Sequence, residues 1–132
     1  MTQPDLTAHF LELVRRTSTD LRPDVEKALR TARGRETEGS AAQGALDAII
    51  KNVELAREKS TPICQDTGTP IFYVHYPGGW STLKLRQQIE EAVAQATAKA
   101  YLRPNAVDSI TGKNSGNNLG TDFPDVHFQE WE

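Results

Sequence analysis

The sequence lacks several features that would place it in a particular class of protein. It has one cysteine, Cys64, in 132 residues, so no disulfide can form within the chain. A lone thiol in a chain whose first residues do not resemble a secretory signal is typical of the reducing cytoplasm. No apolar run approaches the roughly 20 residues that a membrane-spanning helix needs. We therefore expect a cytoplasmic protein that does not enter a membrane.

An excess of positive charge is also missing. Lysine and arginine total 15 against 18 aspartates and glutamates, which gives a net charge of -3, and both signs are spread along the chain. Without a Lys/Arg-rich stripe the chain does not present the surface that nucleic-acid binding requires. Its length suits one modest hydrophobic core, so we expect residues 1–132 to form a single domain.

What the sequence does contain is helical and strand periodicity. Apolar residues recur at three- and four-residue steps in four segments, which predicts helices at about 6–16, 23–34, 38–59 and 82–102. The third of these has the widest apolar face and should pack against a core or another helix. Residues 71–76 and 125–131 have the composition or alternation of strands. The expected fold is α+β, mainly helical with a small antiparallel sheet.

The segment Pro62-Ile-Cys-Gln-Asp-Thr-Gly68 is the first candidate for chemistry. Its loop places the amide of Gln65 and the carboxylate of Asp66 directly beside the thiol of Cys64. A thiolate is a ligand for soft metals, and the neighbouring polar groups could bind a substrate. The same residues can instead be a buried filler and turn formers, and this is the commoner case. One thiolate alone cannot hold a metal centre.

Two later segments carry further candidates. In Tyr101–Val107, Arg103 follows a predicted helix and could bind a carboxylate through two parallel N–H groups, or simply stabilise the carboxyl end of that helix. In Thr111–Gly120, Asn114 belongs to a loop of small and amide residues whose backbone could approach an anion. Neither pattern is specific by itself.

Taken together, the three segments resemble one known family. Pro62–Gly68 resembles the cluster-cysteine motif of iron–sulfur-dependent (class I) fumarate hydratases and of the α subunit of L(+)-tartrate dehydratases. Tyr101–Val107 and Gly112–Asn118 resemble segments that follow it in that family. The order and spacing agree, and the resemblance runs from about residue 5 to the end of the chain.

The resemblance implies a function and a set of site residues. It implies a [4Fe–4S] cluster with Cys64 as the first of three cysteine ligands and one open iron that acts as a Lewis acid. The reaction would be the reversible hydration of fumarate to L-malate, a step of the tricarboxylic acid cycle. Gln65 and Asp66 would contact the dicarboxylate substrate, with Asp66 as a catalytic, proton-handling group. Arg103 would bind a carboxylate, and Asn114, whose loop would line the same region, would be a further substrate-binding residue with no chemical step assigned to it.

The chain also departs from the family's pattern. It lacks the two further cluster cysteines and the second domain, so we expect a truncated N-terminal part that is inactive alone. Its partners would be the remaining catalytic domain or a β subunit, and a second copy in a homo-oligomer. Tartrate is the alternative substrate. A different interpretation is a non-catalytic helical interaction domain, which predicts that the sulfur of Cys64 is buried among aliphatic side chains.

Overall fold

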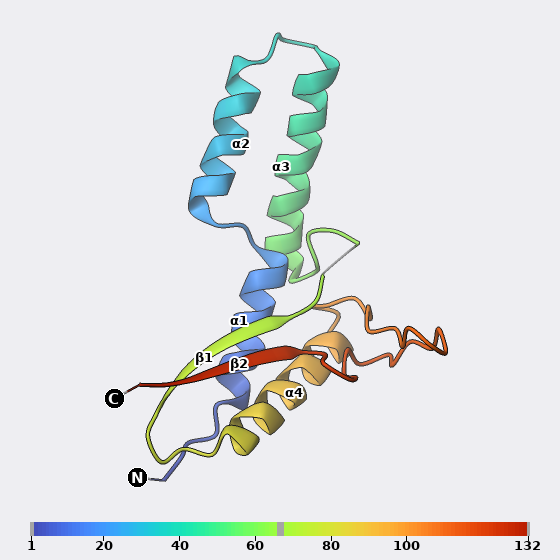
Figure 1. The fold of residues 1–132 in the computed structure, drawn as a ribbon. Helices are drawn as coiled ribbons and strands as arrows, with labels where there is room; N and C mark the ends of the chain where they lie inside the picture. The colour runs from blue at the N-terminus through green and yellow to red at the C-terminus, as the bar shows by residue number, and fades with distance from the viewer. Residues whose placement is uncertain (1, 66–67, 132) are drawn as a thin grey trace.

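The computed structural model describes residues 2–65 and 68–131. These ranges contain four helices and two strands, and the predicted α+β, mainly helical fold is confirmed (Figure 1). The predicted positions agree with the observed ones to within a few residues. In chain order the elements are α1 (Thr7–Thr19), α2 (Pro23–Arg35), α3 (Ala41–Lys59), β1 (Ile71–Pro77), α4 (Thr82–Ala98) and β2 (Asp125–Trp131).

Local sequence explains where the helices begin. The carboxylate of Asp5 accepts a hydrogen bond at 2.9 Å from the N–H of Thr7, the first residue of α1. The hydroxyls of Ser40 and Ser81 accept from N–H groups in the first turns of α3 and α4. Pro23 occupies the first position of α2, where no N–H is needed. The three hydrogen bonds supply partners for backbone groups that the helices themselves cannot satisfy, and the proline removes one such group.

The sheet has a different pairing direction from the one expected. β1 and β2 run parallel, with Ile71 opposite Asp125 and Pro77 opposite Trp131. The prediction of an antiparallel sheet is therefore wrong. The reason lies in the connection, because α4 and the following loop return the chain to the end of the sheet where β1 began. The result is a βαβ unit, in which both strands point the same way.

The core lies between this sheet and two helices. α4 contributes most of it, and Ile89, Val93 and Ala96 have no exposed surface. Val14 of α1 and the inward-facing Phe72 and Val126 of the strands complete the cluster. Burial of these side chains from water is the main force that holds the body together. We call α1, α4, β1 and β2 the body of the molecule.

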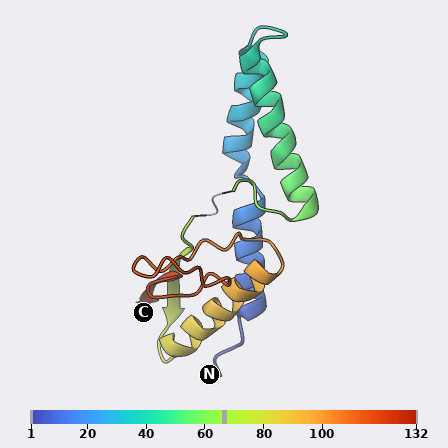
Figure 2. The same ribbon diagram turned by 90° about the vertical axis from the view of Figure 1, so that its right-hand side faces the viewer.

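α2 and α3 form a helical hairpin that projects from the body (Figures 1 and 2). α2, which is described in full, buries none of its side chains, and α3 buries Val53 and Ala56. The wide apolar face of α3 does pack on another helix, as expected. Its coverage is incomplete, since Ile49 keeps 45% of its surface exposed. None of the helices in the described ranges combines the length and the apolar character that spanning a membrane would require.

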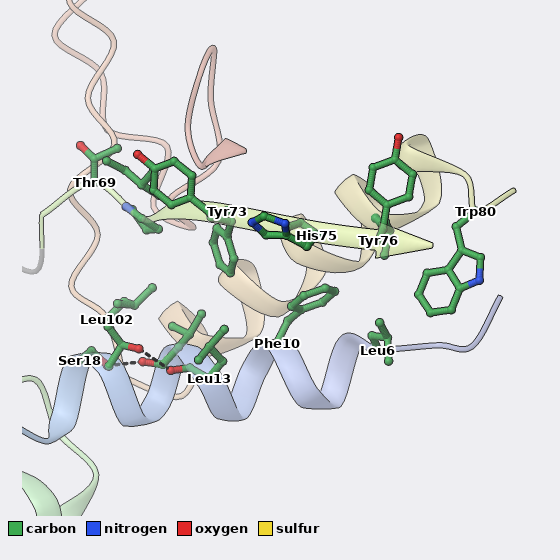
Figure 3. Close-up of a pocket in the computed structure, with 17 residues that line it drawn as sticks. Leu6, Phe10, Leu13, Ser18, Thr69, Tyr73, His75, Tyr76, Trp80 and Leu102 are labelled. Atoms are coloured by element: carbon green, nitrogen blue, oxygen red, sulfur yellow. Dashed lines mark hydrogen bonds between the residues drawn. The ribbon is translucent and has the colours of Figure 1, made fainter. Parts of the chain in front are cut away.

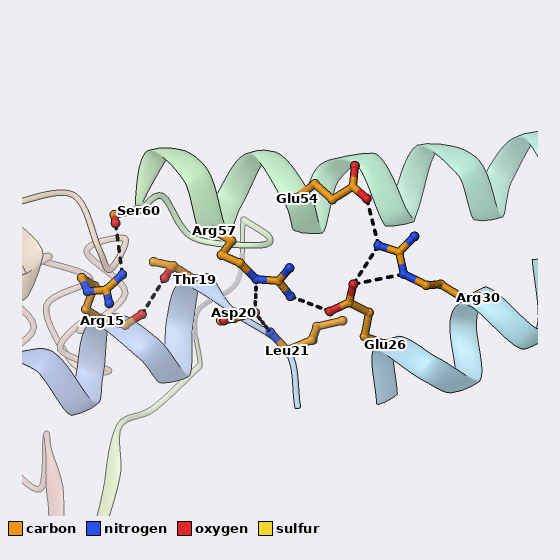
Figure 4. A network of polar contacts seen from close by, with 9 residues as sticks. All are labelled: Arg15, Thr19, Asp20, Leu21, Glu26, Arg30, Glu54, Arg57 and Ser60. Carbon is orange, nitrogen blue, oxygen red and sulfur yellow. Dashed lines mark hydrogen bonds and ion pairs between the residues drawn. The ribbon is translucent and has the colours of Figure 1, made fainter. Parts of the chain in front are cut away.

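Ion pairs connect the hairpin to the end of α1 (Figure 4). The guanidinium of Arg57 donates to the carboxylates of Asp20, at 2.7 Å, and Glu26. Arg30 bridges Glu26 and Glu54, at 2.8 Å to each. Hydrogen bonds from Arg30 and Arg57 lower the pKa of the Glu26 carboxyl. Charged contacts at the base of the hairpin therefore add to the packing of the buried Val53 and Ala56 of α3.

Candidate functional site

The loop between α3 and β1 presents Cys64 at the surface. Just before it, Ile63 is anchored through both of its backbone groups. Its N–H donates to the carbonyl of Ser18 at 3.1 Å, and its carbonyl accepts from the side-chain amide of Asn52 at 2.7 Å. The loop is thus tied to α1 and α3, while the Cys64 side chain is exposed. An anchored loop with an exposed thiol can present that thiol in a defined position.

This geometry separates the two interpretations of Cys64. The interaction-domain interpretation predicted a sulfur sealed among aliphatic side chains, and the exposed position of Cys64 contradicts it. Gln65 is exposed beside it, so both residues are accessible to a ligand from solvent. Asp66, the predicted proton-handling group, lies outside the described residues.

Arg103 follows α4 on a segment that is held by a buried asparagine. Asn118 is 2% exposed, and its side-chain oxygen accepts from the N–H groups of Asn105, at 2.6 Å, and Ala106, at 3.2 Å. Its amide nitrogen donates to the carbonyl of Arg103, at 2.7 Å, and to the hydroxyl of Thr97, at 3.0 Å. Four hydrogen bonds from one side chain fix the backbone on both sides of Pro104. The exposed side chain of Arg103 therefore starts from a fixed backbone position.

Sequence reasoning missed Asn118. It belongs to a segment rich in glycine and asparagine, where each asparagine has the same turn-forming interpretation. In the fold its backbone is left-handed, with φ 59°, a conformation that asparagine tolerates better than most residues. A backbone angle cannot be read from sequence, so no signal distinguished this asparagine from its neighbours. The hydrogen bonds that give Asn118 its importance reach residues 12 to 21 positions away.

Asn114, which is predicted to contact substrate, makes side-chain hydrogen bonds within its own segment of the chain. Its amide donates to the carbonyl of Pro104 at 2.8 Å, and its side-chain oxygen accepts from the N–H of Gly116 at 2.8 Å. One N–H and one lone pair remain for another partner. Nearby, hydrogen bonds from the backbone and side chain of Thr111 lower the pKa of the Asp108 carboxyl. This loop is ordered by its own polar side chains.

Of the predicted site residues that the structure describes, only Asn114 lines one of the two larger cavities. Asn114 lines a polar cavity of about 510 Å3 formed by residues between 106 and 123. A second, apolar cavity of about 680 Å3 runs along β1. Among the described residues, the linings of these two cavities include neither Cys64 nor Arg103. The structure therefore places Asn114 in a cavity without the other predicted site residues.

The described residues do not form a complete metal centre. In residues 2–65 and 68–131 no group of three or more histidine, cysteine, aspartate or glutamate side chains is positioned to hold a metal ion. An iron–sulfur cluster needs three or four protein ligands. The exposed thiol of Cys64 fits the role of one ligand, and the rest of the set would have to come from elsewhere.

The fold and the exposed cysteine loop define an α+β domain that can contribute a single thiolate to a metal centre. The family model described as fumarate hydratase (Fumerase) matches residues 7–132, and the chain belongs to this family. The prediction of a hydro-lyase of the fumarate hydratase and tartrate dehydratase type is thereby confirmed at the level of the family.

Individual relatives carry both of the expected names. The chain is 46% identical to "Putative fumarate hydratase class I" of Geobacillus stearothermophilus over 92% of its own length and 24% of that protein. It is 31% identical to "L(+)-tartrate dehydratase subunit alpha" of Escherichia coli K12 over 91% of its own length and 39% of that subunit. The chain thus spans between a quarter and two fifths of the length of these relatives.

Proposed function

We propose that this chain is the N-terminal part of a [4Fe–4S] hydro-lyase that hydrates fumarate reversibly to L-malate, and that it is inactive alone. The observation that supports this most directly is the exposed Cys64, which lies in a segment that resembles the family's cluster-cysteine motif, within a family match covering residues 7–132. A thiolate at the surface of this part can reach a cluster that it shares with the remainder of the enzyme, and the diacid would bind at the open iron of that cluster.

Cys64 would supply one of the cluster's ligands, with the others contributed by the remainder of the enzyme. When bound, the cluster supplies Lewis-acid chemistry at an iron with an open position. The described residues of this chain supply binding and orientation. Gln65, exposed beside Cys64, would donate its amide to a substrate oxygen. Asp66 is proposed as the proton-handling group on the basis of the family motif alone.

Arg103 would bind one carboxylate of the substrate. Its planar guanidinium can donate two parallel hydrogen bonds, which fixes both the position and the orientation of a carboxylate. The four hydrogen bonds of Asn118 hold the backbone that carries it. Because orientation lowers the entropic cost of reaction, this support would contribute to catalysis without contact with the substrate. Asn114 would contact the substrate only through its remaining N–H or lone pair.

L(+)-tartrate is the second candidate substrate, favoured by the E. coli relative named as a tartrate dehydratase α subunit. Both substrates are four-carbon dicarboxylates, so the same arginine could bind either. The greater identity to the relative named for fumarate hydratase leads us to propose fumarate first.

A chimera tests the proposal. This chain replaces the matching segment of the G. stearothermophilus relative, and the product is reconstituted anaerobically with iron and sulfide. We expect cluster absorbance and fumarate hydration from the chimera, and neither from the isolated chain. In the chimera, Cys64→Ser should remove both signals. Arg103→Lys should keep the absorbance and lower kcat/KM by about 10- to 100-fold, as loss of a charge-assisted hydrogen bond predicts.

Arg35→Lys provides the matched control, since Arg35 lies at the exposed end of α2, far along the hairpin. It should leave absorbance and kcat/KM unchanged. Turnover by the isolated chain would overturn the proposed inactivity. Full cluster content in Cys64→Ser would overturn the ligand role, and faster turnover of tartrate than of fumarate would reverse the order of the two substrates.

A further inference from the structure

An apolar groove runs along β1 on the side away from β2. Its volume is about 680 Å3, and its walls come mainly from α1 and from the consecutive residues 69–76, with further contributions from Trp80, Leu85 of α4 and Leu102 (Figure 3). None of the described residues of β2 lines it. All six residues of β1 from Ile71 to Tyr76 contribute, although alternate side chains point to opposite faces of a sheet. The groove therefore includes the edge of the strand, and it extends beneath the inner face to the buried Val14 and Leu85.

This edge of β1 has no partner strand in residues 2–65 and 68–131, where the sheet consists of β1 and β2 alone. Edge strands are normally protected by charged residues, bulges or a covering element. Residues 71–76 contain no aspartate, glutamate, lysine or arginine, and neither do the other residues described as lining the groove. Backbone N–H and C=O groups along this edge are thus available beside an uncharged surface.

The side chains around the groove are incompletely covered. Leu13 of α1 keeps 54% of its surface exposed, and Tyr73 of β1 keeps 74%. Figure 3 shows Phe10 and Leu13 on the α1 side facing β1 across the groove. A strand added to β1 would lie above α1 and would cover these residues, as α4 covers the inner face of the existing sheet.

The parallel pairing indicates what kind of partner completes this edge. Parallel sheets occur almost only where both faces are covered by helices, and two strands rarely form a stable sheet by themselves. Here the outer face carries the half-exposed Ile71 and Trp131. A two-stranded parallel unit with an uncovered face and an apolar edge is favourable for the addition of a further strand.

We propose that an extended segment from the remainder of the hydro-lyase docks in this groove and adds a strand to the open edge of β1. This rests on the proposed function, in which the rest of the enzyme supplies the other cluster ligands. The relatives provide the length for it, because the chain spans 24% of one and 39% of another. The groove also begins beside the Cys64 loop, since Ser18, which lines it, accepts the hydrogen bond from Ile63.

Hydrogen exchange in the isolated chain and in the chimera tests the docking without reference to activity. In the isolated chain, the amides of residues 71–76 that point away from β2 should exchange rapidly. In the chimera the same amides should exchange at least about tenfold more slowly, because a strand now accepts their hydrogen bonds. If the chimera is insoluble, hydrogen exchange is measured instead at the matching strand of the full-length G. stearothermophilus relative. Slow exchange of its outward-pointing amides would support the docking, and rapid exchange would contradict it.

A pair of variants locates the effect. Leu13→Glu places a charge in the groove and should abolish the added protection in the chimera while leaving the isolated chain folded. Leu83→Glu is the matched control, because Leu83 is 65% exposed on α4 and does not line the groove. It should leave the added protection intact.

Three outcomes would overturn the docking proposal. They are equal exchange in chimera and isolated chain, protection that survives Leu13→Glu, and protection of the isolated chain that rises with concentration alongside a dimer in light scattering. The last result would assign the edge to a second copy. An active chimera whose β1 amides exchange rapidly would refute the docking and leave the proposed function standing. A chimera with protected β1 amides but no turnover would support the docking and contradict the proposed function.

Discussion

The helical hairpin and the body of the molecule are stabilised in opposite ways. The body surrounds residues with no exposed surface at all, such as Ile89 and Val93, whereas α2 buries no side chain along its full described length. The hairpin is instead connected by Arg57, Arg30 and Arg33, each paired with one or two carboxylates. Exposed ion pairs contribute little and are screened by salt, while buried apolar contacts are not.

The solvent-accessible surface area of the chain is larger than a compact fold would give. The chain exposes 8903 Å2, whereas a compact protein of this size is expected to expose about 6,900 Å2. The projecting hairpin and the open edge of β1 both contribute to the excess. Such surface is characteristic of a part that is completed by further protein, which agrees with the proposed docking. It also predicts that changes in the two regions will have unequal consequences.

The largest effect should come from the core of the body. Ile89→Ala removes buried methyl groups between α4 and the sheet and should lower the free energy of unfolding by about 2–5 kcal/mol. Urea unfolding followed by far-UV circular dichroism measures this loss. Leu83→Ala, on the exposed side of the same helix, should change the free energy by less than about 0.5 kcal/mol. Comparable losses in the two variants would contradict the placement of the core.

A smaller effect is expected at Asn118, where the body supports the candidate site. Asn118→Ala removes four hydrogen bonds and leaves buried backbone groups without partners, which should cost about 1–3 kcal/mol. Urea unfolding gives the global loss, and hydrogen exchange at Asn105 and Ala106 shows whether the loop opens locally. Asn118→Gly distinguishes the loss of the side-chain hydrogen bonds from the strain of a positive φ. Glycine also lacks the amide but tolerates this backbone conformation, whereas alanine does not.

Asn117→Ala is the control for the Asn118 variants. Asn117 is exposed, and its side chain accepts one hydrogen bond, from the N–H of Leu119. This substitution should have a much smaller effect on unfolding and on exchange at Asn105. If Asn118→Gly were as stable as the unmodified chain, backbone strain and not hydrogen bonding would explain the Ala variant.

At the base of the hairpin, Arg57→Leu should have a local effect only. It removes the contacts to Asp20 and Glu26, so the amides of α2 should exchange faster while those of α4 stay protected. Arg35→Leu is a matched control, because Arg35 makes no ion pair within the described ranges. An increase in exchange throughout α4 would show that the hairpin and the body unfold as one unit. It would contradict the view that the two regions are stabilised in different ways.

The sequence was sufficient for the elements of both regions but not for their assembly. Periodicity identifies the helices because each has a face that packs on other residues, and Pro23 and Ser81 mark the starts of α2 and α4, whereas the predicted start of α3 at about residue 38 lies before its cap at Ser40. The strand patterns at 71–76 and 125–131 carry no pairing direction, which is why the antiparallel assignment failed. The apolar face of α3 does not reveal how much of it remains in solvent.

The candidate site shows the same division. The residues alone favoured a buried, structural Cys64, and only the family motif indicated the exposed position that the structure has. Asn118 could not be predicted, because its role depends on contacts with residues 97, 103, 105 and 106 that exist only in the folded chain. The exposure of a residue in a short motif can be inferred from a family resemblance, whereas support by distant residues cannot be read from sequence.

The smallest predicted effect is a dependence of the hairpin on pH. Hydrogen bonds from Arg30 and Arg57 lower the pKa of Glu26 from its usual 4.5, so the charged carboxylate is favoured in the folded chain. Its contribution to stability is therefore complete above about pH 4.5 and is lost as the pH falls through the lower, folded pKa. Carboxyl NMR of Glu26 from pH 7 downward measures this pKa directly. In Arg57→Leu the pKa should rise toward 4.5, and in 1 M salt the shift should shrink, because salt screens exposed charges. A Glu26 pKa that is insensitive to both would mean that the ion pairs do not organise the base of the hairpin, and that the apolar contacts of α3 hold it as they hold the body.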